Sequence, residues 1–125
     1  MSRIIKRLEV LGDKGRGEAE ILFDSEASQS VVRKSLAEKL ATIIKLPKAR
    51  RFKLADGKTE AKTDLLANIM VAIDSVIIDT RFYVLEKLGR EIIIGASTMQ
   101  EWDIRLNLKD EKITVGQDPN AIELY

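Results

Sequence analysis

Residues 21–30, ILFDSEASQS, decide how the rest of this chain is interpreted, because an apolar run stops there abruptly at an acid. Residues 21–23 have the composition of a buried strand, and Asp24 and Glu26 follow directly. One interpretation is a strand-end acid that caps the following loop, which is a common use of aspartate. The other is a reaction centre at the edge of the core. The rest of the sequence is needed to distinguish a capping acid from a reaction centre.

The composition limits the chemistry that such a centre could use. The 125 residues are the size of one domain, and 45% hydrophobic with 33% charged residues is typical of a globular protein. The chain has neither cysteine nor histidine, which excludes thiol nucleophiles, disulfides, thiolate metal sites, His-based triads and His-ligated zinc. An enzyme built from this chain would have to use carboxylate, lysine, tyrosine or hydroxyl groups.

Charge and hydropathy argue against nucleic acid and membrane as partners. The 21 basic and 20 acidic side chains nearly cancel, to a formal net charge of +1. Residues 48–53 carry a local excess of positive charge, which we interpret as a solvated strand face or turn. No apolar run approaches the ~18 residues of a membrane-spanning helix, and the N-terminus lacks the apolar core of a signal peptide. We therefore expect a cytoplasmic protein.

Most of the chain has the composition and alternation of β-strands. The first two strands are predicted to form a hairpin around the glycine-rich turn 12–17. Residues 65–73, nearly all apolar, predict a strand that is covered on both faces. The other predicted strands are residues 4–11, 18–23, 51–55, 58–63, 78–84, 91–95, 104–109 and 112–115.

One long helix is predicted after the acid-bearing loop. Ser28 or Ser30 is expected to cap its start, and Pro47 lies just past its end. Residues 97–102 predict a further one or two helical turns. No repeat, linker or low-complexity tract divides the chain, so we predict one mostly-β domain over residues 1–125. The apolar residues at helical spacing on the long helix are Val32, Leu36, Leu40 and Ile43 or Ile44.

Three features occur in order along the chain: the acid-bearing loop 24–28, the strong turn signal Asp56-Gly57, and the apolar residues 92–94 with a glycine before a short helix. In this order they resemble the retropepsin-like aspartic proteases, including the small cellular and prokaryotic members. That family has a strand ending in D-[ST]-G-[AS]-[ST], then a flap hairpin, then a hydrophobic–hydrophobic–Gly motif and a short helix. The resemblance covers roughly residues 5–115. It implies an acid-protease β-barrel with one main helix and a flap hairpin, assembled as a two-fold homodimer.

The resemblance also implies roles for particular residues. Asp24 matches the catalytic aspartate, and Gly95 matches the glycine that lets a second loop pass close beneath the catalytic one. Ser25 matches the hydroxyl that binds across the dimer. The residues of the supporting catalytic loop are Ser25, Glu26, Ala27 and Ser28. Those of the flap and the substrate-binding region are Ala55, Asp56, Gly57 and Lys58.

The chemistry that this family implies needs no metal or cofactor. Two carboxylates a few ångströms apart share one proton, because both cannot ionise cheaply. The ionised member activates a water molecule, and the protonated member polarises the peptide carbonyl. The implied function is a homodimeric aspartic endopeptidase acting on polypeptides. Its pair of aspartates should titrate as a unit, with activity at acidic to mildly acidic pH.

Glu26 departs from the family pattern, which has glycine at this position. Glycine permits a tight loop, whereas glutamate adds bulk and a charge beside the catalytic pair. One alternative is therefore a retropepsin-fold module without peptidase activity, used for dimerisation or peptide binding. A third hypothesis needs no resemblance: Asp24 and Glu26, on one face of an extended strand, would hold Mg²⁺ or Mn²⁺. The tail 116–125 ends in apolar residues and is a candidate strand for pairing across the dimer axis.

Overall fold

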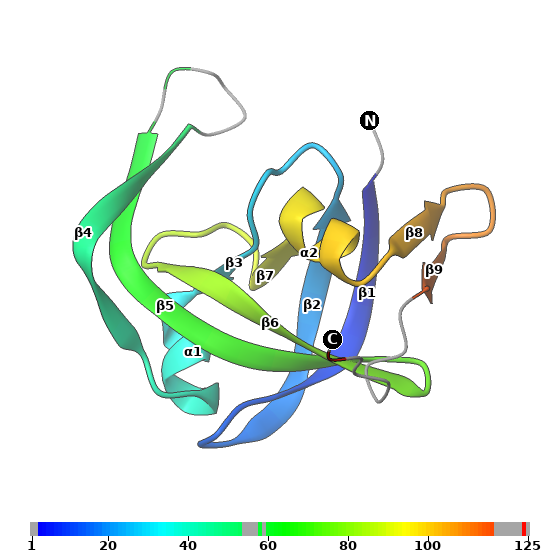
Figure 1. The fold of residues 1–125 in the computed structure, drawn as a ribbon, viewed down its shortest axis with the longest axis horizontal. Coiled ribbons are helices and arrows are strands. Elements are labelled where there is room, and N and C mark those ends of the chain that lie inside the picture. Colours follow the sequence, from blue (N-terminus) through cyan, green and yellow to red (C-terminus); the bar gives the residue numbers. More distant parts are fainter. Residues whose placement is uncertain (1–2, 54–57, 59, 117–123, 125) are drawn as a thin grey trace.

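The computed structural model describes residues 3–53, 58, 60–116 and 124. Within these residues the chain forms strands and two short helices (Figure 1). They are β1 Arg3–Leu11, β2 Arg16–Asp24, β3 Val31–Arg33, α1 Lys34–Leu40, β4 Ile44–Lys53, β5 Glu60–Ile73, β6 Val76–Leu85, β7 Ile92–Ile94, α2 Ala96–Glu101, β8 Ile104–Asn107 and β9 Lys112–Val115.

Six of the strands close into a barrel in the order β1-β2-β7-β3-β6-β5. Closure occurs where β5 pairs back to β1, with Val10 opposite Val71 and Leu11 opposite Met70. The strand β4 continues the sheet beyond β5 and forms the arm at the left of Figure 1. The strands β8 and β9 form a separate hairpin. Closing the sheet leaves few unpaired edges, and it confirms the mostly-β barrel that the sequence predicts.

The core fills the inside of this barrel. Alternate residues of β2, such as Ile21 and Phe23, are fully buried, because successive side chains of a strand point to opposite faces. Residues of β6 and β7, among them Phe82 and Ile92, complete the same cluster from the other side. Burial of each such side chain contributes about 1.5–3 kcal/mol. The core therefore fixes which residues of each strand face outward.

The long helix predicted from apolar spacing is wrong in its length. Helix α1 spans only Lys34–Leu40, because Val32 belongs to β3 and Ile44 begins β4. Both residues are β-branched, and pairing with neighbouring strands overrides the helical spacing. Both predicted helices are therefore present in the described residues: the first is shorter than expected, and α2 confirms the helical turns predicted at residues 97–102.

The helix boundaries also differ from the prediction. Neither Ser28 nor Ser30 caps α1; the N-cap residue is Arg33, without a side-chain hydrogen bond. Pro47 lies inside β4, where the pairing with β5 shifts between Lys45 and Arg50. A residue without an N–H is tolerated at such an irregularity because no ladder bond is lost there.

The strand β5 is not covered on both faces. Its burial alternates over much of its length, and Met70 is 36% exposed. Only around Leu66 and Ala67 are both faces buried, because Leu66 packs outside the barrel in a second apolar cluster with Val31, Tyr83 and Leu85. The antiparallel pairing of β4 with β5 confirms that the predicted strands 51–55 and 58–63 pair over their described residues, whereas the Asp56-Gly57 turn and its role as a flap stay predictions.

Several predictions fall outside the described residues. The predicted flap residues Ala55, Asp56 and Gly57 lie there, as does most of the tail 116–125; Lys58 is described and exposed. The part of the chain that the structure describes contains no helix long and apolar enough to cross a membrane. The cytoplasmic location and the single-domain boundary at residues 1–125 stay predictions.

Candidate functional site

Asp24 is the last residue of β2, opposite Arg3 of β1. Its side chain is 18% exposed, and its Oδ2 lies 3.7 Å from the Nε of Arg3. Its Oδ1 accepts a hydrogen bond from the Glu26 backbone N–H at 3.0 Å. The Ala27 N–H donates to the Asp24 carbonyl at 3.2 Å, which closes a β-turn. A buried strand therefore presents a carboxylate at its end, with one oxygen held by the backbone and the other facing a guanidinium.

Glu26 lies in this turn with its side chain exposed. The described non-glycine residues with positive φ are Asp74, Asp103 and Glu111, so Glu26 has a backbone conformation open to any L-residue. The position therefore accepts a glutamate without backbone strain.

The turn also bears on the hypothesis of a metal site. Asp24 ends the strand and Glu26 follows in a turn, so the prediction that both share one face of an extended strand is wrong. Among the residues described, no group of three carboxylate, histidine or cysteine side chains is arranged to hold a metal ion.

The loop after Asp24 is fastened to a second loop at the start of α2. The Ala96 N–H donates to the Ala27 carbonyl at 2.6 Å, and the Ser97 N–H donates to the Ser28 carbonyl at 3.1 Å. At Gly95 a Cβ would lie 2.5 Å from the Gln29 carbonyl oxygen and 2.6 Å from that of Ala27. Such an approach of two backbones requires glycine. The two loops form one braced unit; the catalytic roles of their residues stay predictions.

Buried hydroxyl groups support this unit from below. Ser30 Oγ accepts the Gly95 N–H at 3.1 Å and lies 2.6 Å from Thr98 Oγ1. Thr98 Oγ1 lies 2.9 Å from Thr80 Oγ1, and all three hydroxyl residues are buried. These hydroxyl contacts were not predicted from the sequence, where Ser30 was expected to cap a helix. The available signal was Thr80, a hydroxyl residue between Ile78 and Phe82 at the inward-facing positions of β6, which are otherwise apolar.

An apolar row crosses the outer face of the sheet beside Asp24. Cross-strand partners in register lie side by side on one face, and Leu22 shares this face with Asp24 because the two are two residues apart on β2. From β1 to β4 the row consists of Ile5, Leu22, Ile93, Val31, Tyr83, Leu66 and Ile44.

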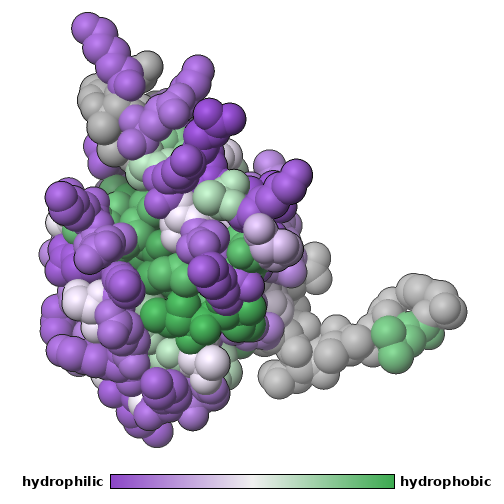
Figure 2. Space-filling model, turned by 90° about the vertical axis from the view of Figure 1, so that its left-hand side faces the viewer, coloured by the Kyte–Doolittle hydropathy of each residue, from purple (hydrophilic) through white to green (hydrophobic). Residues whose placement is uncertain are grey.

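The middle of this apolar row is covered and its ends are open. Phe52 packs against Tyr83 with ring centroids 5.0 Å apart, whereas Ile5 and Ile44 are 48% and 49% exposed. Figure 2, which views the molecule from the side of β4, shows apolar side chains gathered in the middle of the face and hydrophilic ones around them. Apolar groups of another molecule could therefore contact the row at its open ends, at Ile5 near Asp24 and at Ile44 on β4.

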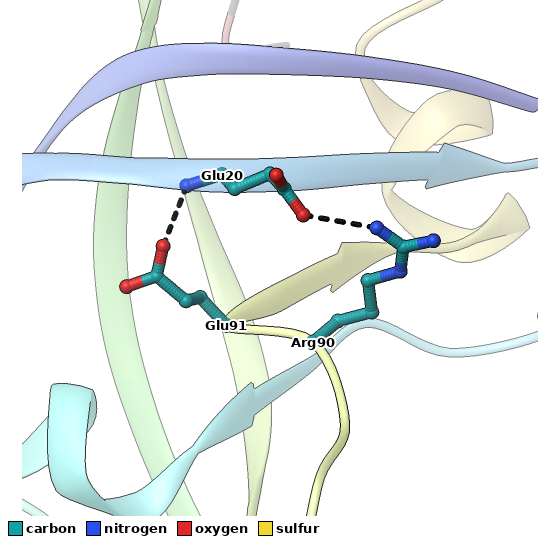
Figure 3. Close-up of polar contacts among 3 residues, drawn as sticks. All are labelled: Glu20, Arg90 and Glu91. Atoms are coloured by element: carbon teal, nitrogen blue, oxygen red, sulfur yellow. Dashed lines mark hydrogen bonds and ion pairs between the residues drawn. The ribbon is translucent and has the colours of Figure 1, made fainter.

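Charged side chains border the apolar row on the side away from Asp24. In Figure 3, Arg90 Nη1 donates to Glu20 Oε1 and the Glu20 N–H donates to Glu91 Oε1, each at 2.9 Å. Glu20 lies two residues before Leu22 on β2, and hence on the same face. These charged groups bind one another through hydrogen bonds, so this border has its own partners within the protein. The sequence gives no sign of it, because residues 20 and 90 meet only through the pairing of β2 with β7.

A cavity of about 350 Å³ lies at the β1 end of the apolar row. Ile5 and Leu22 are among its lining residues, with Arg3 on the side of Asp24 and Leu108 from the β8–β9 turn. Asp24 thus adjoins both an apolar row and a cavity.

Comparison with known proteins bears on the fold. No family model matches the chain, and no curated protein is similar to it in sequence. Among solved structures, the crystal structure of the retroviral protease-like domain of Ddi1 from Leishmania major is similar, with a TM-score of 0.62. The fold is retropepsin-like. The alignment covers 94% of this chain and 90% of that one, at 17% identity, and similarity at that identity concerns the fold alone.

Proposed function

We propose that this protein is a homodimeric aspartic endopeptidase in which Asp24 of two copies forms the catalytic pair. The observation that carries the proposal is the carboxylate of Asp24 at the end of β2, in a turn braced by the Gly95 loop. The retropepsin-like fold supports it independently of sequence identity. Since each chain offers one such carboxylate, a second copy has to supply the other.

The proposed chemistry needs only these two carboxylates and water. Held a few ångströms apart, the pair shares one proton. The ionised Asp24 takes a proton from water as the water oxygen attacks the peptide carbonyl carbon, and the protonated one donates to the carbonyl oxygen. As the C–N bond of the resulting diol breaks, the Asp24 that took the water proton gives it to the amine nitrogen, and the other Asp24 takes a proton from a diol hydroxyl, which restores the shared proton. Positioned acid–base catalysis of this kind contributes about 10²–10⁴-fold.

The apolar row indicates the kind of substrate. Ile5 is half exposed and Ile93 part-buried on the face that carries Asp24, so a polypeptide with apolar side chains next to the scissile bond fits best. Arg3 is half exposed, which leaves its guanidinium able to swing away from Asp24 as a second carboxylate approaches.

A retropepsin-fold module without peptidase activity is the second candidate. The observation that favours it is Glu26, which adds a carboxylate two residues from Asp24. In a dimer, two such groups would lie near the pair and would oppose its ionisation. The exposed position of Glu26 and its unstrained turn favour the peptidase.

A cleavage assay on denatured protein from about pH 3.5 to 7 separates the two candidates. The peptidase proposal predicts cleavage by the native chain and none by Asp24→Asn, in which the amide keeps the Glu26 N–H contact. The Glu26→Gly variant should cleave at least as fast. Cleavage by Glu26→Gly alone would favour the inactive module. No cleavage by either chain, or equal cleavage by Asp24→Asn, would contradict the peptidase.

A further inference from the structure

A polar cavity of about 520 Å³ lies on the outer face beside β5 and β6, between the loop that follows Asp24 and helix α2. The polar side chains at this cavity come from four segments that are distant in the sequence. Besides the buried Thr80 and Thr98, they are Gln29, Asn68, Asp79, Arg81, Ser97 and Glu101.

The register of β5 and β6 makes the cavity continuous with the apolar row. Asn68 pairs with Arg81, two residues along from the pair Leu66 and Tyr83 that belongs to the row. The guanidinium of Arg81 lies over the Tyr83 ring, 5.8 Å from its centroid. The cavity therefore lies to one side of the row, along the direction of β5 and β6, so that a side chain projecting sideways from a polypeptide on the row would pass Arg81 and meet Asp79.

The charges of the cavity differ from those of the opposite border, where Arg90 pairs with Glu20. Within the described ranges, Asp79 and Glu101 take part in no ion pair or side-chain hydrogen bond, and both are exposed. Two carboxylates against one guanidinium leave the cavity with an excess of negative charge. Its unused acceptors suit a group that only donates hydrogen bonds.

We propose that this cavity binds a lysine or arginine side chain of the polypeptide that lies on the apolar row. The inference rests on the proposed function, since it names a feature of that substrate. An ammonium or guanidinium group carries donors only, and the carboxylates of Asp79 and Glu101 with the amide oxygens of Gln29 and Asn68 accept them. Arg81 stays over Tyr83, at the side of the cavity nearest the apolar row.

The cavity is also connected to the catalytic loop through hydrogen bonds. Its floor includes Thr80 and Thr98, whose hydroxyls continue to Ser30 and from there to the Gly95 N–H. A side chain bound there would contact the same braced unit that holds Asp24. The distance from scissile bond to basic residue should consequently be fixed, which a positional scan can detect.

The test uses peptide binding to the Asp24→Asn chain, so that it does not depend on cleavage. The probes are fluorescent apolar octapeptides, each extending over roughly 26 Å, in which a single lysine is moved one position at a time. One lysine position, or two neighbouring ones, should bind roughly tenfold more tightly than the lysine-free peptide. The added variant pair Asp79→Asn and Glu101→Gln should remove that gain. Asp74→Asn, which removes one negative charge outside the cavity on the β5–β6 turn, should keep it.

Three results would overturn the inference. The first is that no lysine position raises the peptide affinity, and the second is that the affinity gain persists without both cavity carboxylates. The third is that a glutamate moved along the peptide in place of the lysine raises the affinity at one position, and that Arg81→Gln removes this gain. Failure of the proposed function gives a different pattern. A lysine gain without cleavage by the native chain would leave the cavity as a peptide-binding site on an inactive module. Cleavage without a lysine preference would refute the cavity alone, and absence of any peptide binding would refute both.

Discussion

The two ends of strand β2 are fastened in similar ways but hold their acids differently. Before β2, the turn that carries Asp13 docks on the end of helix α1, where the Lys14 N–H donates to the Leu40 carbonyl at 2.9 Å. A Cβ on Gly12 would overlap that carbonyl group. After β2, the loop that carries Asp24 docks in the same manner on the turn before α2, through Gly95.

The difference lies in what satisfies each carboxylate. Asp13 accepts the Thr42 N–H at 2.7 Å on one oxygen and the Thr42 hydroxyl on the other, and these hydrogen bonds, that of the hydroxyl first, lower the pKa of Asp13. Asp24 has one oxygen on the Glu26 N–H and the other 3.7 Å from the Arg3 guanidinium. Asp13 is fully used in joining two segments. Asp24 keeps an oxygen toward a movable side chain, beside an apolar face.

Substitution of the two glycines should give the largest effects on stability. Gly12→Ala and Gly95→Ala both place a Cβ against a backbone carbonyl, so each should lower the free energy of unfolding by about 3 kcal/mol in urea denaturation. Gly89→Ala is the matched control, since nothing lies within 4 Å of a Cβ there. If Gly95→Ala were as stable as this control, the loop after β2 would not depend on a close backbone approach as the turn before β2 does. Among folded molecules, only Gly95→Ala should slow cleavage.

Removal of the buried hydroxyls should have an intermediate effect on the free energy of unfolding. These hydroxyls support the loop after β2, so the effect would distinguish the two ends of the strand. Thr98→Val loses contacts to both Ser30 and Thr80 and should lower the free energy of unfolding by about 2 kcal/mol. Thr80→Val loses one such contact and should lower it by about 1 kcal/mol. Thr114→Val, on an exposed position of β9, serves as the control. Equal stabilities of the three variants would mean that the hydroxyl chain does not support the loop.

The smallest predicted effect is the pH dependence of the Asp13 contact. Because its folded-state pKa is below the usual 3.8, this carboxylate stabilises the fold above that pH, and the contribution is lost as the pH falls through the folded-state pKa. The difference in Tm between the native chain and Asp13→Asn should therefore shrink between about pH 5 and pH 2. A difference that stays constant over this range would contradict the assignment of both oxygens to Thr42.

The parts of the fold that depend on local pattern could be predicted from the sequence. The hairpins β1–β2, β4–β5 and β8–β9 are predicted by alternating hydrophobicity and turn residues, and the composition of residues 92–94 predicts a short buried strand. The length of α1 could not be predicted, because Val32 and Ile44 fit a helical spacing as well as a strand. Tertiary pairing decided between the two.

The candidate site likewise has a part that could be predicted from the sequence and a part that could not. Asp24 and Gly95 belong to short motifs and could be singled out, whereas the contacts around them join residues far apart in the chain. Ser30 meets Thr98 across 68 positions, and Glu20 meets Arg90 across 70. Such contacts follow from the closure and register of the barrel, which no local pattern encodes.

The central claim, that two copies share one catalytic pair, is tested most directly by mixing chains. Native and Asp24→Asn chains are unfolded together, refolded in varying ratio at constant total concentration, and assayed for cleavage. If activity requires Asp24 from both copies, it should fall with the square of the native fraction, to about one quarter in an equal mixture. A linear fall, to about one half at equal mixing, or no cleavage by the native chain, would contradict the account.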